Sequence, residues 1–224
     1  MGINLPNFRE VTPLEEYEIN WTRYETLDEA TAVSKADLIA KVTLKSKKEY
    51  IQDTKEIPEI PPEIPELYYT VFDFSVDEIY YCRDNDIKKG GSLKAFTTAN
   101  SYDWTEELIE INENEECIVF FTKVQPMPED AAKSYEIADY VLTSPVQLVF
   151  KKSKHGYEVH KDLILFSKNG VEIDSKELEI NPDVMSQKEI MDRKRRKNFV
   201  VVKNEIKKII EKIVEKDNET LCIC

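Results

Sequence analysis

The stretch Asp37-Leu-Ile-Ala-Lys-Val-Thr-Leu-Lys45 decides the fold, because every second residue from Leu38 to Leu44 is apolar. Such alternation places one set of side chains on a buried face and the other in water, which is typical of a β-strand. The pattern recurs in Phe72-Asp-Phe-Ser-Val76, Leu93-Lys-Ala-Phe-Thr97 and Glu116-Cys-Ile-Val-Phe-Phe-Thr-Lys123. Together the four strands predict a small antiparallel barrel or sandwich.

Two details of these strands predict how the barrel is built. At Asp77-Glu78 the alternation slips by one residue, after which Ile79 and Tyr81 take the core side. A slip of one residue predicts a β-bulge, which lets a long strand bend around a small barrel. The strand that begins at Glu116 is apolar on both faces, so a helix is expected to cover its second face.

Two capping boxes predict helices. The first, Thr26-Leu-Asp-Glu29, precedes a short helix to about Lys35, and the second, Ser186-Gln-Lys-Glu189, opens a long helix over residues 186–217. The short helix is expected to bury Leu27, Ala30 and Val33. The long helix carries an apolar stripe at three- and four-residue spacing: Phe199, Val202, Ile206, Ile209 and Ile213. This stripe can pack on the chain's own barrel, dock on a partner, or pair with a second copy.

Further strands are expected between the barrel core and the long helix. The apolar residues Val146, Leu148 and Phe150 predict a fifth strand, and the segment from Tyr157 to Val159 predicts another. Lys168-Asn-Gly170 is a hairpin signal between apolar runs.

Charge is distributed unevenly along the chain. The formal net charge is −13, which argues against general binding to nucleic acid or to anionic membranes. Between Lys188 and Lys216, however, 11 basic residues stand against 5 acidic ones. Arg193, Arg195 and Arg196 belong to a basic run that either docks on the acidic body or faces a partner.

Residues 55–66 contain three Glu-Ile-Pro units, which favour the polyproline II conformation. Ile57, Ile60 and Ile64 are therefore candidate contacts to an aromatic groove of a partner. The alternative interpretation is a stiff connection between the first two strands.

Several features bear on cellular location and on covalent chemistry. No run approaches the roughly 18 apolar residues of a membrane span, and Met1-Gly-Ile-Asn-Leu-Pro6 lacks the regions of a signal peptide. Cys82 and Cys117 are either neighbours across the sheet or buried free thiols. Cys222 and Cys224 lie in a short tail. The tail could bind a metal ion or form an intermolecular disulfide, or it could be exposed without a specific role.

The sequence contains no pattern that predicts an enzyme, a metal site or a cofactor site. His155 and His160 have a spacing that matches no metal motif. The start of residues 84–91 is similar to a calcium-binding loop. However, Lys88 and Lys89 occupy positions where such a loop has calcium ligands and glycine. A Cys–His enzyme would have to use Cys82 or Cys117 with His160 as its base.

The order of strands resembles a group of uncharacterised Gram-positive bacterial proteins that are exported or lipid-anchored. The matching pieces are Ser34-Lys-Ala-Asp-Leu-Ile-Ala-Lys-Val-Thr43, Tyr69-Thr-Val-Phe-Asp-Phe-Ser-Val-Asp-Glu-Ile-Tyr80, the Lys89-Gly-Gly91 turn and Glu113-Asn-Glu-Glu-Cys-Ile-Val-Phe-Phe121. The resemblance covers under half of the chain and implies an OB-like five-stranded barrel, as in tissue-inhibitor and netrin-type domains. The chain departs from the group by lacking a signal peptide, by Asn114 in place of glycine, and by its long helix.

These observations predict a mainly β (α+β) protein. We expect a lead-in over 1–25, an OB-like barrel over 26–166, a hairpin or linker over 167–185, the helix over 186–217 and a tail over 218–224. The expected function is non-enzymatic protein binding at a bacterial cell surface, with no cofactor. The candidate contacts are Ile57, Ile60, Ile64, Tyr80, Tyr102, Arg193, Arg195, Arg196, Ile206 and Ile213.

Two other functions stay open. An OB-like barrel can bind single-stranded nucleic acid, and Lys41, Lys45, Lys47 and Lys48 cluster on the first strand. The second is the Cys–His enzyme. A cytoplasmic location is the alternative to the cell surface.

Overall fold

The computed structural model describes residues 8–11, 27–53, 66–97, 111–124, 137–144, 148–160, 163–168, 170–172 and 198–221. The elements in chain order are β1 (Phe8–Val11), α1 (Glu29–Lys35), β2 (Leu38–Asp53), β3 (Glu66–Cys82), β4 (Ser92–Thr97), β5 (Glu116–Lys123), β6 (Tyr140–Leu142), β7 (Val149–Ser153), β8 (Gly156–His160), α2 (Ile164–Ser167), β9 (Val171–Glu172), β10 (Asn198–Val201) and α4 (Lys203–Leu221).

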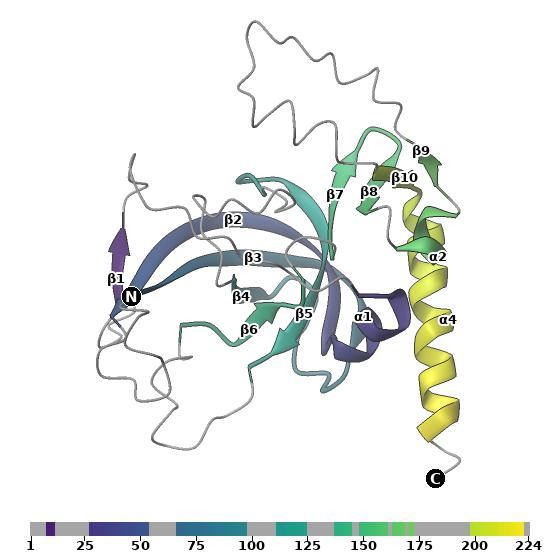
Figure 1. Cartoon of the computed structure of the whole chain (residues 1–224), viewed down its shortest axis with the longest axis horizontal. Helices are drawn as coiled ribbons and strands as arrows, with labels where there is room; N and C mark the ends of the chain where they lie inside the picture. The colour runs from purple at the N-terminus through teal and green to yellow at the C-terminus, as the bar shows by residue number, and fades with distance from the viewer. Residues whose placement is uncertain are drawn as a thin grey trace, which may run out of the picture.

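Five strands close into a barrel in the order β2-β3-β4-β6-β5 (Figure 1). The barrel closes because β5 pairs back onto β2, with Leu38 opposite Phe121 and Thr43 opposite Glu116. Every pairing in the ring is antiparallel except that of β4 with β6, which is parallel. The predicted OB-like β-barrel with added helices is therefore the observed fold class.

The fifth barrel strand differs from the one expected. It is the short β6, whereas the strand expected at Val146 to Phe150 is β7, which pairs with the start of β5 and leads out of the barrel. From there β8, β10 and β9 follow as a second sheet, joined to the barrel along β5. The alternation in β6 is too short to be recognised, because three residues complete hardly more than one period.

The bulge expected in β3 is present, and a second one follows it. Asp77 has no partner on β2 between the pairs Val42–Val76 and Lys41–Glu78, and Tyr80 is skipped in the same way. Ile79 consequently packs against the barrel interior, as predicted. Tyr81 instead packs on the outside, because the second bulge reverses the alternation again.

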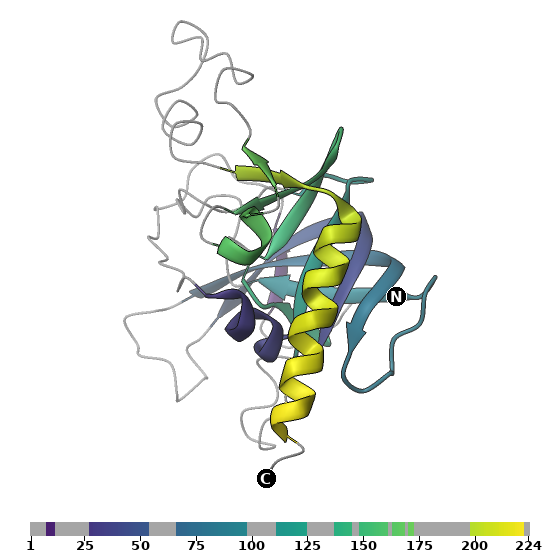
Figure 2. The same ribbon diagram turned by 90° about the vertical axis from the view of Figure 1, so that its right-hand side faces the viewer.

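Both faces of β5 are covered, as its apolar composition predicted. Cys117, Val119 and Phe121 point into the barrel, where aromatic side chains pack edge to face. Ile118 and Phe120 point outward into a second apolar cluster, where α1, α2 and α4 cover the barrel wall. We call this second cluster the outer cluster. Figure 2 shows α4 lying across this wall, with α1 beside it.

Near the N-terminus, helix α1 begins later than the sequence predicts. The N-cap of α1 is Asp28 rather than Thr26, and its carboxylate accepts a hydrogen bond from the Thr31 backbone N–H at 2.8 Å. Ala32, not Ala30, is buried beside Leu27 and Val33. The expected lead-in contains β1, which pairs with the far end of β2.

The C-terminal region contains the largest differences from expectation. Residues 198–201 form strand β10, and α4 begins only at Lys203, so Phe199 and Val202 are not part of a helical stripe. The apolar run at 199–202 favours a strand because β-branched and aromatic residues suit a pleated, half-buried surface. The earlier part of the expected helix, residues 186–197, lies outside the described residues.

The expected hairpin at Lys168-Asn-Gly170 is also absent from the described part of this region. Ile164–Ser167 is a helical turn, and β9 pairs with β10 rather than with a preceding strand. Gly170 lies so close to β10 that an added Cβ would come within 2.9 Å of the Phe199 Cβ. This glycine therefore permits a close approach of two strands, and its N–H closes a turn onto the Ser167 carbonyl oxygen that does not join two paired strands.

Candidate interaction surface

Tyr80 is half-buried rather than exposed as expected. Its ring packs against the outer apolar cluster, and its hydroxyl is buried without a hydrogen-bond partner in the described part of the chain. Burial, followed by the negative charges of Glu78 and Glu116, raises the pKa of this hydroxyl. A buried hydroxyl of this kind is poorly placed to anchor a partner.

The apolar side chains of α4 are directed toward the chain's own barrel. Ile206 is fully buried, and Ile213 is 8% exposed. The Lys203 ammonium group in the first turn of α4 bonds to the Glu78 carboxylate of β3. The hydrogen bond from Lys203 lowers the pKa of Glu78, and burial opposes it. The self-docking interpretation of this helix is therefore the one that the structure supports.

The remaining predicted contacts lie outside the described residues. They are Ile57, Ile60, Ile64, Tyr102, Arg193, Arg195 and Arg196. The tail cysteines Cys222 and Cys224 also lie outside this part of the chain. These predictions stay predictions.

Cys82 and Cys117 are free thiols on opposite sides of β2. Cys82 is opposite Leu38 on one side, and Cys117 is opposite Val42 on the other. The Cys117 thiol points into the barrel, and burial raises its pKa, which disfavours the nucleophilic thiolate. His160 belongs to the second sheet, opposite Asn198. This placement gives no support to a Cys117–His160 pair.

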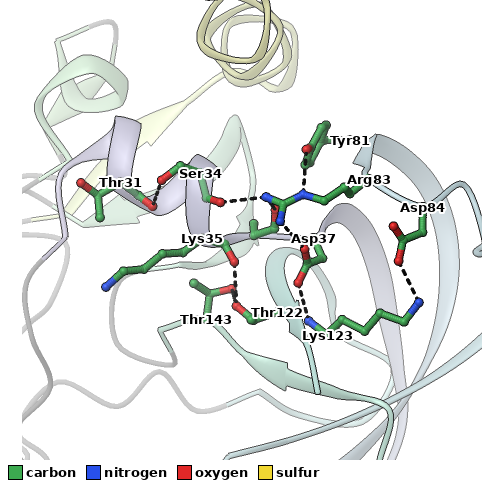
Figure 3. A network of polar contacts seen from close by, with 11 residues as sticks. Thr31, Ser34, Lys35, Asp37, Tyr81, Arg83, Asp84, Thr122, Lys123 and Thr143 are labelled. Atoms are coloured by element: carbon green, nitrogen blue, oxygen red, sulfur yellow. Dashed lines mark hydrogen bonds and ion pairs between the residues drawn. The ribbon is translucent and has the colours of Figure 1, made fainter. Parts of the chain in front are cut away.

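A polar network lies at the end of the barrel where α1 leads into β2 (Figure 3). Arg83, just after β3, forms an ion pair with Asp37 at 2.9 Å and donates to the Ser34 carbonyl oxygen at 2.9 Å. Asp37 also accepts a hydrogen bond from the Lys123 backbone N–H at the end of β5. The network therefore fixes the end of α1 against two barrel strands.

Lys123 extends this network to the turn between β3 and β4. Its ammonium group lies 2.9 Å from an Asp84 carboxylate oxygen and 2.6 Å from one of Asp86. The hydrogen bond from Lys123 is the main reason why the pKa of Asp86 is lowered. Because these charges are satisfied by one another, we interpret the network as a structural brace rather than a binding site.

A different surface is distinguished by exposed apolar side chains. Among the described residues, the large hydrophobic side chains that are exposed are Ile164 (61%), Leu165 (46%), Val171 (76%) and Val202 (54%). All four come from α2, β9 and the junction of β10 with α4. We call this set the apolar corner. These elements are neighbours, because β10 pairs with β9 and contacts α2.

The apolar corner rests on well-packed structure. Phe166 of α2 and Val201 of β10 are fully buried in the outer cluster, where Phe166 packs edge to face on Phe150. The Leu165 backbone N–H also donates to the buried Glu29 carboxylate of α1. The exposed side chains are thus presented from anchored elements, which lowers the entropy lost when a partner binds.

Comparison with known proteins assigns no family to this chain. The chain matches no protein-family model, and no curated protein was found to be similar to it. Within the described ranges, no helix is long and apolar enough to cross a membrane. The same part of the chain contains no group of three His, Cys, Asp or Glu residues arranged to hold a metal ion.

The apolar corner was not predicted from the sequence, because the spacing of Val202 fits a buried helical stripe. One signal could have revealed it. Phe199-Val-Val-Val202 is apolar at four consecutive positions, whereas a strand with one buried face needs only alternate ones. Surplus apolar residues of this kind are typical of a surface that a partner covers.

Proposed function

We propose that this chain is a non-enzymatic protein-binding module and that its partner docks on the apolar corner. The observation that carries the proposal is the concentration of the exposed large apolar side chains on adjoining elements. Large apolar side chains that stay exposed on neighbouring elements are costly in water and often mark a site of protein–protein interaction. The partner's complementary chemistry is a protein surface with aliphatic or aromatic side chains.

Nucleic acid is a less suitable ligand for the described surfaces. Single-strand binding needs exposed aromatic platforms, but Tyr69, Phe74 and Phe96 of the barrel strands are buried. Lys41, one of the candidate basic residues, is paired with Glu116 at 3.4 Å. The net charge of −13 would also repel a phosphate backbone.

The proposed setting is a bacterial cell surface. Its support is the resemblance of the strand pattern to exported Gram-positive proteins, with the Lys89-Gly-Gly91 turn among the matching pieces. Surface labelling of intact cells with a membrane-impermeant reagent tests the location directly. Protection of the chain in intact cells, with labelling only after lysis, would contradict this setting.

Site-specific photo-cross-linking tests the docking surface. A photoreactive amino acid is placed at Val171 in one variant and at Lys212, on the exposed face of α4, in a matched control. We expect a protein adduct from position 171 and none from position 212. Both positions are exposed, so neither replacement should disturb folding.

Three results would overturn the proposal. An adduct from position 212 alone would move the interface to the outer face of α4. Cross-linking of two copies of this chain would replace the partner by self-association. Recovery of nucleic acid, lost at moderate salt, would favour the single-strand-binding alternative.

A further inference from the structure

We draw no further inference here: the strongest candidate, the buried Tyr80 hydroxyl at the seam between the barrel wall and α4, has no hydrogen-bond partner among the described residues, but nothing in the structure shows what would bind it.

Discussion

At the scale of single residues, Tyr80 and Tyr157 form an informative pair. Both side chains pack in the outer cluster, and both hydroxyls feel the charge of the Glu116 carboxylate. The Tyr157 hydroxyl donates to Glu116 at 2.5 Å, whereas that of Tyr80 is buried without a partner in the described part of the chain. The two tyrosines thus differ in whether the hydroxyl group has a hydrogen-bond partner.

Replacement of each tyrosine by phenylalanine should separate these two situations. Tyr80→Phe removes an unsatisfied hydroxyl, so the free energy of unfolding should stay unchanged or rise by up to about 1 kcal/mol. Tyr157→Phe removes a hydrogen bond to a charged group and should cost about 1.5–3 kcal/mol. Urea unfolding of the two variants beside the wild type measures both values. A larger loss for Tyr80→Phe than for Tyr157→Phe would contradict the assigned geometry.

The Lys203–Glu78 contact makes a prediction about acid. Because the pKa of Glu78 is lowered in the fold, its contribution to stability is complete above its ordinary pKa of about 4.5. That contribution is lost as the pH falls through the lowered value. Glu78→Gln should therefore be less stable than the wild type at pH 7, by about 0.2–1 kcal/mol for so exposed a pair.

The stability difference between the two proteins should shrink as the pH falls below the ordinary pKa of a glutamate and through the lowered pKa of Glu78. Unfolding free energies measured from pH 7 to pH 3 check this, and Lys212→Ala is a matched control on the exposed face of α4. A difference that grows as the pH falls would show that Glu78 is not the acid-sensitive contact.

At the scale of elements, α4 is the helix for which the structure selects among the interpretations that the sequence allowed. Its apolar stripe was open to three interpretations, and the structure buries Ile206 and Ile210 completely in the outer cluster. The helix therefore belongs to the fold, and it helps to cover the outward apolar face of β5. Its outward face carries ion pairs within the helix, such as Lys208 with Glu205 at 2.7 Å.

Truncation of one buried side chain of α4 should reveal this role. Ile210→Ala leaves a cavity against the barrel wall and should lower the free energy of unfolding by about 2–5 kcal/mol. Lys212→Ala, two residues away on the exposed face, should change it by less than about 0.5 kcal/mol. Denaturant unfolding of both variants gives the comparison. Equal stabilities would mean that α4 is not packed on the barrel in solution.

The barrel could be predicted from sequence because its long strands are each several alternation periods in length. The bulge at Asp77 was predictable for the same reason, since a slip is visible only against a regular pattern. Strands β6 and β10 were missed because one is too short and the other, at residues 198–201, was read with a helical period. The N-cap moved from Thr26 to Asp28 because both residue types can cap a helix.

The candidate site was harder to predict than the fold. Tyr80 alternates as an outward residue of β3, but only the packing of α4 and the second sheet decides that its hydroxyl is buried. Exposure of Val171 and Val202 likewise depends on how β9, β10 and α4 meet. Tertiary packing of distant segments sets these exposures. The local pattern at 199–202 shows a surplus of apolar residues but not which of them stays exposed.

At the scale of the whole molecule, the barrel, the second sheet and the helices share one apolar cluster on the outside of β5. That cluster contains residues far apart in the sequence, from Leu27 just before α1 to Ile213 in α4. The apolar corner is the part of this assembly where large apolar side chains remain exposed within the described residues. We therefore assign α4 to stability and propose the apolar corner as the recognition surface.

The role of the apolar corner can be measured as the affinity of the cross-linked partner for three forms of the full chain. These are the wild type, the double variant Val171→Asp/Val202→Asp, and the control Lys212→Ala, measured by surface plasmon resonance at about 0.1 and 0.5 M salt. We predict that the double variant binds at least about tenfold more weakly at both salt concentrations, while the control binds like the wild type. Unchanged binding by the double variant would contradict the assignment of the apolar corner as the recognition surface.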